Sequence, residues 1–184
     1  GDITDKIVAT CEAYNLQTEK RQEIFFYLFQ ECDLYIRSVR ANKFVENILD
    51  LPVDVYGRGW EHLSEKAGKA RFHAPIDASL LSSIYADTQF LLNTSPNISS
   101  GIHERVAYGL GARCCVISDQ NTFSEIHLKD IQTFKGFDFF DEEFRSSMHN
   151  LYYSDFDYTD LTDNGVKYIE KNLSAKEMFF NLLN

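Results

Sequence analysis

Short apolar runs alternate with stretches of helical spacing along this chain, and that alternation constrains its fold more than any other feature. The runs that we interpret as strands are 53–56, 70–74, 89–93, 114–118 and 131–134. Helical spacing is found at 18–51, 62–69, 79–86, from about Gly101 onward, and near 142–151, 163–172 and 175–183. Strands that alternate with helices at this spacing form βαβ units, in which helices cover both faces of a parallel sheet. The sequence therefore predicts an α/β fold, with residues 1–184 as a single domain.

The charge of the chain excludes some classes of partner. The 184 residues hold 18 basic and 28 acidic side chains, a net charge of −10, whereas proteins that bind nucleic acid or anionic membranes present basic surfaces. Segment 138–163 has eight acids and one base, or −7, which leaves −3 for the remainder. An anionic small ligand is therefore compatible with the remainder, and the acidic segment is expected to be solvated surface. The triplet Asp155-Phe156-Asp157 is interpreted in the same way, because a poor strand precedes it and a metal-binding Asp-x-Asp motif needs a good one.

The cysteines and the apolar runs indicate where the protein works. Cys11, Cys32, Cys114 and Cys115 show no metal-ligand spacing and are expected to be reduced and buried, as in the cytoplasm. No apolar run approaches the roughly 20 residues that span a bilayer, and no signal peptide opens the chain. The chain begins with Gly1 rather than methionine, so we expect it to be part of a larger protein.

The loop that follows the third strand has the composition of a phosphate site. In parallel sheets, ligands bind beyond the carboxyl ends of the strands. Here a loop rich in hydroxyl and amide groups leads into a helix that is expected to begin near Gly101, with Ser99 or Ser100 as its N-cap. Helix N-termini bind anions. Arg105 is disfavoured at this end by the helix dipole, but its guanidinium can grip a phosphate with two hydrogen bonds.

Neighbouring side chains extend this candidate site. His103 can donate to the anion or carry a proton near neutral pH, and Glu104 suits the positive end of the helix even without a ligand. After the fourth strand, Asp119 or Glu125 is placed to hold a ribose or sugar hydroxyl, with a capped turn as the alternative. A surface helix with unrelated polar residues is the alternative for the phosphate site itself.

Two further loops follow the first and second strands. The segment Gly57-Arg58-Gly59 allows a sharp turn and a close approach to a ligand, and a plain strand-to-helix turn is the alternative. Trp60 is either a core anchor or a stacking platform. Near Pro75 the backbone is extended and can meet the edge of a base. His73 is part of that segment, and a structural histidine is the alternative.

Four blocks of sequence, in this order, carry a resemblance to a known family: 53–60, 83–93, 101–106 and 116–119. They resemble the C-terminal half of GT-B glycosyltransferases, especially the bacterial group that includes the spore maturation protein B-like enzymes. The resemblance covers about 35–128. It implies a Rossmann-like domain that binds the nucleotide diphosphate of a sugar donor.

The resemblance also implies roles for the candidate residues. The segment 57–60 would lie at the donor cleft, and 73–76 would lie near the base. Ser99, Ser100, Gly101, His103, Glu104 and Arg105 would face the diphosphate, with Arg105 and His103 as catalytic groups that offset leaving-group charge. Asp119 and Glu125 would face the donor sugar or phosphate. No metal and no cofactor are expected, since helix dipoles and basic side chains stabilise the leaving diphosphate in this family.

The implied activity is transfer of a hexose from a nucleotide-diphosphate sugar to an acceptor. The partner that it needs is an N-terminal acceptor-binding domain, so the chain would be a fragment of a two-domain enzyme. Two positions depart from the family pattern: Tyr108 stands where an acidic residue usually binds the ribose, and Arg113 stands where a glycine is usual. A degenerate, non-catalytic module that binds a nucleotide or a protein is therefore one alternative, and another Rossmann-like enzyme, such as an epimerase, is a second.

Overall fold

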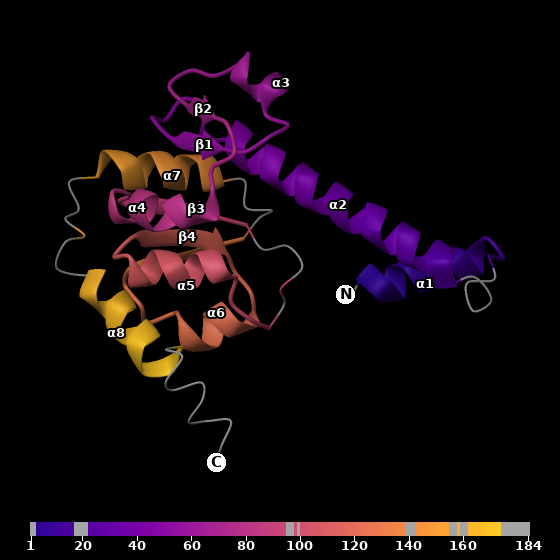
Figure 1. The fold of residues 1–184 in the computed structure, drawn as a ribbon. Coiled ribbons are helices and arrows are strands. Elements are labelled where there is room, and N and C mark those ends of the chain that lie inside the picture. The colour runs from indigo at the N-terminus through magenta and orange to yellow at the C-terminus, as the bar shows by residue number, and fades with distance from the viewer. Residues whose placement is uncertain are drawn as a thin grey trace. The chain divides into compact units, whose positions relative to one another are not determined.

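The computed structural model describes residues 3–16, 22–94, 98, 100–138, 143–154, 158 and 162–173 (Figure 1). Internal contacts divide the chain into two units, residues 1–43 and 44–184. Helix α2 (Gln22–Glu46) runs through the boundary without interruption. The expectation of a single domain therefore stays a prediction.

The first unit consists of helix α1 (Ile3–Ala13) and most of α2. Five half-buried side chains of α2 share one face, at helical spacing: Phe25, Leu28, Phe29, Cys32 and Ile36. Other large apolar side chains of α2 are exposed, among them Phe26 and Tyr35. The sequence predicts α2 within 18–51, whereas it does not predict α1, because Ile7 and Cys11 are the only buried residues among those of α1 whose burial the structure describes.

The described residues of the second unit form five short strands in two parallel sheets. β1 (Asp54–Tyr56) pairs with β2 (Arg71–His73). The three-stranded sheet has the order β3-β4-β5, with β3 (Phe90–Asn93), β4 (Cys115–Asp119) and β5 (Phe134–Phe137). All five predicted strands are present, although β5 begins where the predicted strand 131–134 ends. The sheet is also hydrogen-bonded as two pieces rather than one.

Helices cover both faces of the three-stranded sheet, as expected for an α/β, Rossmann-like fold (Figure 1). The remaining helical elements are α3 (Glu61–Ser64), η2 (Ala78–Leu80), α4 (Leu81–Ala86), α5 (Glu104–Gly111), α6 (Thr122–His127), α7 (Phe144–Tyr153) and α8 (Thr162–Asn172). Val116 of β4 belongs to one core cluster, with residues of α4, α5 and α8. Its neighbour Ile117 belongs to a second, with the end of α2 and with α7. The helix predicted at 175–183 lies outside the described residues.

Helix α5 lies unusually close to the strands. A Cβ atom built on Gly109 would be 2.4 Å from Leu91 Cδ2 and 2.8 Å from Val116 Cγ2. Both distances are shorter than any normal contact between carbon atoms, so α5 packs at its present depth only because residue 109 has no side chain. The start of α5 is thereby held near the carboxyl ends of β3 and β4.

The four cysteines differ in how deeply they are buried. Cys11, Cys114 and Cys115 are buried and Cys32 is half-buried, and all four are free thiols. Burial raises the pKa of Cys114 and of Cys115 to about 11, so both remain protonated at neutral pH. Buried, reduced thiols are therefore confirmed for three of the four cysteines, and the prediction is only partly right for Cys32.

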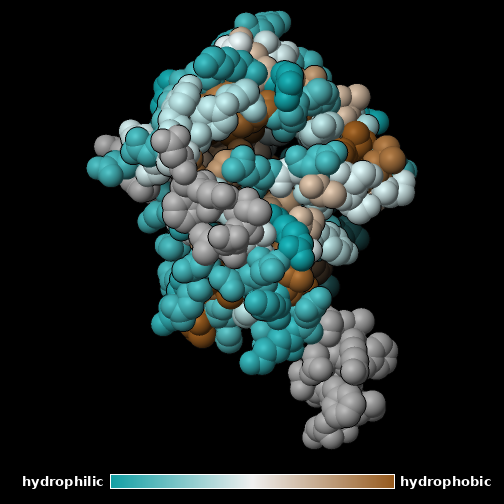
Figure 2. Space-filling model, turned by 90° about the vertical axis from the view of Figure 1, so that its left-hand side faces the viewer, coloured by the Kyte–Doolittle hydropathy of each residue, from teal (hydrophilic) through white to brown (hydrophobic). Residues whose placement is uncertain are grey.

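The surface agrees with the predicted solvation of the acidic segment. On the face that Figure 2 shows, hydrophilic residues predominate and hydrophobic ones lie in separate patches. The acidic residues of segment 138–163 that the structure describes are Asp138, Glu143 and Asp163, and all three are exposed. None of the described helices combines the length and the apolar character needed to cross a lipid bilayer.

Arg113, one of the two departures from the family pattern, ends helix α5. Its φ of 67° is in the left-handed region, where glycine is the usual residue. The Cys114 N–H donates to the Gly109 carbonyl and the Arg113 N–H donates to the Leu110 carbonyl, which together form a Schellman motif. The Arg113 side chain pairs with Asp163 on α8. The missing glycine is therefore a matter of helix termination and not of the candidate site.

Replacing Arg113 by glycine should leave the stability unchanged or raise it by up to about 1 kcal/mol, because relief of the left-handed backbone outweighs an exposed ion pair. Arg113→Ala should be less stable than Arg113→Gly, since alanine keeps the backbone strain and loses the pair. Urea unfolding of the three proteins measures both differences. A glycine variant that is clearly less stable than the alanine variant would show that φ at this position is not strained.

Candidate functional site

Helix α5 begins three residues later than the sequence suggested. Its N-cap is His103, whose extended backbone precedes Glu104 and whose Nδ1 accepts a hydrogen bond of 3.1 Å from the Arg105 N–H. The prediction that the helix begins near Gly101 with a serine cap is therefore wrong, because the imidazole takes the place of the hydroxyl. Ser100 is exposed, and Ser99 lies outside the described residues.

The side chains of His103 and Arg105 lie against each other. The Arg105 Nη2 atom is 3.4 Å from His103 Nε2. Because Nδ1 accepts a hydrogen bond, a neutral His103 must carry its proton on Nε2. Nε2 and Nη2 are then both donors, and a single acceptor oxygen placed between them would satisfy both. Arg105 is exposed. Burial of Tyr85 raises the pKa of that residue, and the positive charge of Arg105 opposes this rise.

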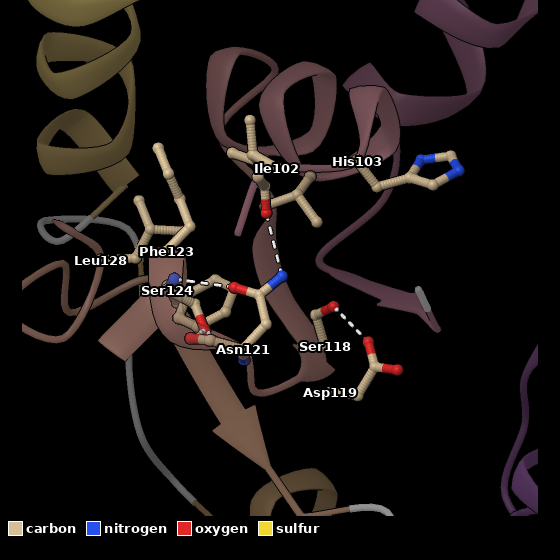
Figure 3. A pocket seen from close by; sticks show the side chains of 11 residues that line it. Ile102, His103, Ser118, Asp119, Asn121, Phe123, Ser124 and Leu128 are labelled. Atoms are coloured by element: carbon tan, nitrogen blue, oxygen red, sulfur yellow. Dashed lines mark hydrogen bonds between the residues drawn. The ribbon is translucent and has the colours of Figure 1, made fainter. Parts of the chain in front are cut away.

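A small, shallow hollow, open to solvent, lies beside this helix start (Figure 3). It is lined by Gly101, His103, Ser118, Asp119 and Asn121, together with apolar side chains of α5, α6 and β5. The His103 ring points away from Ser118 and Asn121 in this view. The structure thus brings three of the predicted residues, Gly101, His103 and Asp119, to one hollow. Glu104, Arg105 and Glu125 are exposed and are not part of its lining.

Asp119 is held at the edge of the hollow by a row of buried polar side chains. The Asn93 Nδ2 donates to Ser118 Oγ over 3.0 Å, and Ser118 Oγ donates to Asp119 Oδ1 over 3.2 Å. Asp119 has only 7% of its surface exposed. This row joins the ends of β3 and β4, and it directs a carboxylate, an acceptor of hydroxyl hydrogen bonds, toward the hollow.

Asn121 was not predicted to be a site residue. Its Nδ2 donates to the carbonyl oxygens of Ile98 and Gly101, at 2.8 and 2.9 Å. Its Oδ1 accepts the Ser124 N–H, and Ser124 Oγ lies 2.9 Å from the Asn121 N–H, so the two residues form a capping box at the start of α6. An asparagine three residues before a serine is the signal that could have predicted this helix. No sequence signal indicates the bonds to the loop after β3.

A second group of predicted residues lies at the ends of β1 and β2. Gly57 has φ +141° and Gly59 has φ +82°, so both depend on the freedom of glycine. A Cβ on Gly57 would be 3.0 Å from Trp60 Nε1, and Trp60 is half-buried. Arg58 is exposed between the glycines. The Gly57 N–H donates to the His73 carbonyl over 3.1 Å, so the structure places the predicted loop beside the predicted histidine.

The side chain of His73 belongs to an exposed ladder across β1 and β2. Asp54 accepts two hydrogen bonds from Arg71, at 2.9 and 2.6 Å. Its Oδ1 atom also lies 2.6 Å from His73 Nε2. The His73 ring stacks on Tyr56, with ring centroids 4.6 Å apart. His73 is thus fixed by structural partners, while one side of the stack remains exposed to solvent.

This ladder makes stability depend on pH through Asp54. Hydrogen bonds from Arg71 and, to a lesser extent, from His73 hold the pKa of Asp54 below its ordinary value of 3.8. A lowered pKa stabilises the folded state fully above 3.8, and this contribution disappears as the pH falls through the lowered pKa. Urea unfolding should therefore show wild type more stable than Asp54→Asn at neutral pH, with the difference vanishing in strong acid. A difference that persists in acid would show that packing, and not the charge of Asp54, is responsible.

The described part of the chain contains no gathering of three His, Cys, Asp or Glu side chains that could hold a metal ion. Asp155 and Asp157 lie outside that part. The absence of a metal or cofactor from the reaction stays a prediction.

Comparison with known proteins gives one match. The sequence profile of a family described as glycosyl transferase-like matches residues 37–157, which include all five described strands and the hollow. Searches of curated proteins and of solved structures give no significant match. Because the profile covers more than half of the 184 residues, the protein belongs to the glycosyl transferase-like family.

Proposed function

We propose that the second unit binds the nucleotide diphosphate of a sugar donor, as the donor-binding half of a GT-B glycosyltransferase. Membership of the family supports a role in glycosyl transfer. Beyond family membership, the proposal specifies the donor site, the transfer of a hexose, and the need for an N-terminal acceptor-binding domain. It agrees with a parallel sheet whose strand ends carry the candidate residues, because ligands bind at that edge in such sheets.

The observation that carries this proposal is the pair formed by His103 and Arg105. Nε2 and Nη2, two hydrogen-bond donors that lie 3.4 Å apart at the start of α5, suit one oxygen of a phosphate. The dipole of α5 adds to the attraction for negative charge. A hydroxyl of ribose or of the sugar is the group that the buried carboxylate of Asp119 would bind.

These positions give each residue a role in transfer. The bond between the anomeric carbon and the diphosphate oxygen breaks, the acceptor oxygen bonds to that carbon, and the acceptor loses a proton. Negative charge develops on the departing diphosphate, and Arg105 and His103 would stabilise it there. Arg58, between the two glycines after β1, is a further cation for the same charge. The N-terminal domain would bind the acceptor and supply the base that takes its proton.

Titration calorimetry with UDP, GDP, ADP, CDP and dTDP, each beside its nucleoside, tests the proposal. At least one diphosphate should bind, and it should bind at least tenfold more tightly than its nucleoside because the phosphates meet the helix start. Absence of binding by all five, with circular dichroism showing a folded chain, would refute it. Binding of diphosphate and nucleoside with equal affinity would place the phosphates away from α5.

The exposed side chain of Tyr108 favours one other function. It has 60% of its surface exposed on α5, at the position where an acidic residue would bind ribose. A module that uses this face to bind a protein would need no nucleotide. The calorimetric series distinguishes the two functions, since a protein-binding module gives no heat with any diphosphate.

A further inference from the structure

We propose that Asn121 is a positioning residue that sets the conformation of the loop carrying the donor's diphosphate site. This inference rests on the proposed function, because it assigns a role within the same site. Figure 3 shows the Asn121 side chain between the loop that carries Ile102 and the start of α6. Its amide group is the one place where the segments after β3 and after β4 are joined by a single side chain in the hydrogen bonds described above.

The geometry uses the whole amide of Asn121. Both hydrogens of Nδ2 are directed at loop carbonyls, of Ile98 and of Gly101, and Oδ1 accepts from the Ser124 N–H. Only asparagine offers two donors and one acceptor at this length. The two carbonyls flank the loop immediately before His103, so their orientation determines where the chain enters α5. Asn121 therefore governs the backbone that presents His103 and Arg105.

The surroundings support a role beyond capping. A cap needs only the acceptor oxygen, which serine or aspartate supplies as well as asparagine. The two donors of Asn121 contribute nothing to the cap of α6. They are used entirely on the loop after β3, where they bind the carbonyl oxygens of Ile98 and Gly101.

The oxygen of Asn121 caps α6, whereas its two N–H donors bind the loop. A capping role and a positioning role therefore predict opposite results for the same variants. In Asn121→Asp the cap is kept, but a carboxylate faces the carbonyls of Ile98 and Gly101 and repels them. Asn121→Ser also keeps a cap, and loses the two bonds without adding repulsion. If Asn121 were only a cap, the aspartate variant would be as stable as wild type, with an unaltered loop.

We expect hydrogen–deuterium exchange at the amides of residues 105–107, which donate to the side chain or the carbonyl of His103, to be about tenfold faster in Asn121→Ser. The loop that positions His103 loses two hydrogen bonds there, and exchange should be faster still in Asn121→Asp. The affinity for the diphosphate that wild type binds should fall in the same order, while the affinity for the matching nucleoside should change much less. Ser124→Ala is the matched control, because it weakens the capping box and leaves both loop bonds in place. Its exchange at 105–107 should equal that of wild type.

The experiment separates failure of this inference from failure of the proposed function. If wild type binds no diphosphate, the proposed function fails, while the exchange rates still report whether Asn121 holds the loop. Unchanged exchange at residues 105–107 in Asn121→Asp would overturn the positioning role, whatever the binding result. Faster exchange throughout the chain, to the same degree in all three variants, would also overturn it, because it would indicate general destabilisation.

Discussion

Replacement of Gly109 by valine should lower the free energy of unfolding by about 3 kcal/mol, the upper part of the usual range for an overpacked core. The Cβ alone would meet Leu91 Cδ2 at 2.4 Å and Val116 Cγ2 at 2.8 Å. Leu91 packs against the core that contains Val116, so neither side chain can move without displacing others. Urea unfolding followed by circular dichroism measures the loss.

Gly111→Ala is the matched control, two residues further along the same helix. A Cβ there would be 4.0 Å from Ile169 Cγ2, its nearest neighbour, and would meet no obstacle. Alanine should therefore keep the stability or raise it by up to about 1 kcal/mol, through its higher helix propensity. Equal losses for Gly109→Val and Gly111→Ala would contradict the close approach of α5 to the strands.

Replacement of Arg105 by alanine should weaken nucleoside diphosphate binding by about ten- to a hundredfold, the value of one or two charge-assisted hydrogen bonds. The guanidinium is exposed, so the loss should become smaller as the salt concentration rises. Arg105→Lys should recover part of the affinity, because lysine keeps the charge and loses the planar, two-donor geometry. Titration calorimetry with the diphosphate that wild type binds measures all three proteins.

A matched control for the loss of one positive charge is Arg37→Ala. Arg37 lies on α2, where it pairs with Asp33 one turn away, and it is not among the predicted site residues. Its removal should leave the affinity unchanged. If Arg105→Ala binds as well as Arg37→Ala does, the phosphate is not at the start of α5, and the role given to His103 falls with it.

The sequence predicted the strands better than the helix starts, for a physical reason. Every residue of β4 is buried, so the apolar run at 114–118 itself marks that strand. The start of α5 depends on which side chain satisfies a backbone N–H, and His103 does so where a serine was expected. Helix α6 was missed because its first turn, from Asn121, is polar and short.

The candidate site was predictable only in part. Gly101, His103 and Asp119 lie around one hollow because parallel strands end at the same edge, a rule that sequence reasoning can use. Asn93 and Asn121 were beyond its reach, since each acts through partners that are distant along the chain. The sequence presents Arg113 as a departure that bears on activity, whereas its backbone shows that it ends a helix.

Gly109 links the packing of the core to the position of the candidate site at the start of α5. Helix α5, which packs against the strands because of this glycine, is only eight residues long. A displacement at one end of so short a helix tilts the other end. A change that moves α5 away from the strands therefore displaces His103 and Arg105. Conversely, a ligand that binds those two side chains stabilises the packed position of α5. Ligand binding at His103 and Arg105 and the stability of the fold are therefore thermodynamically linked through this one short helix.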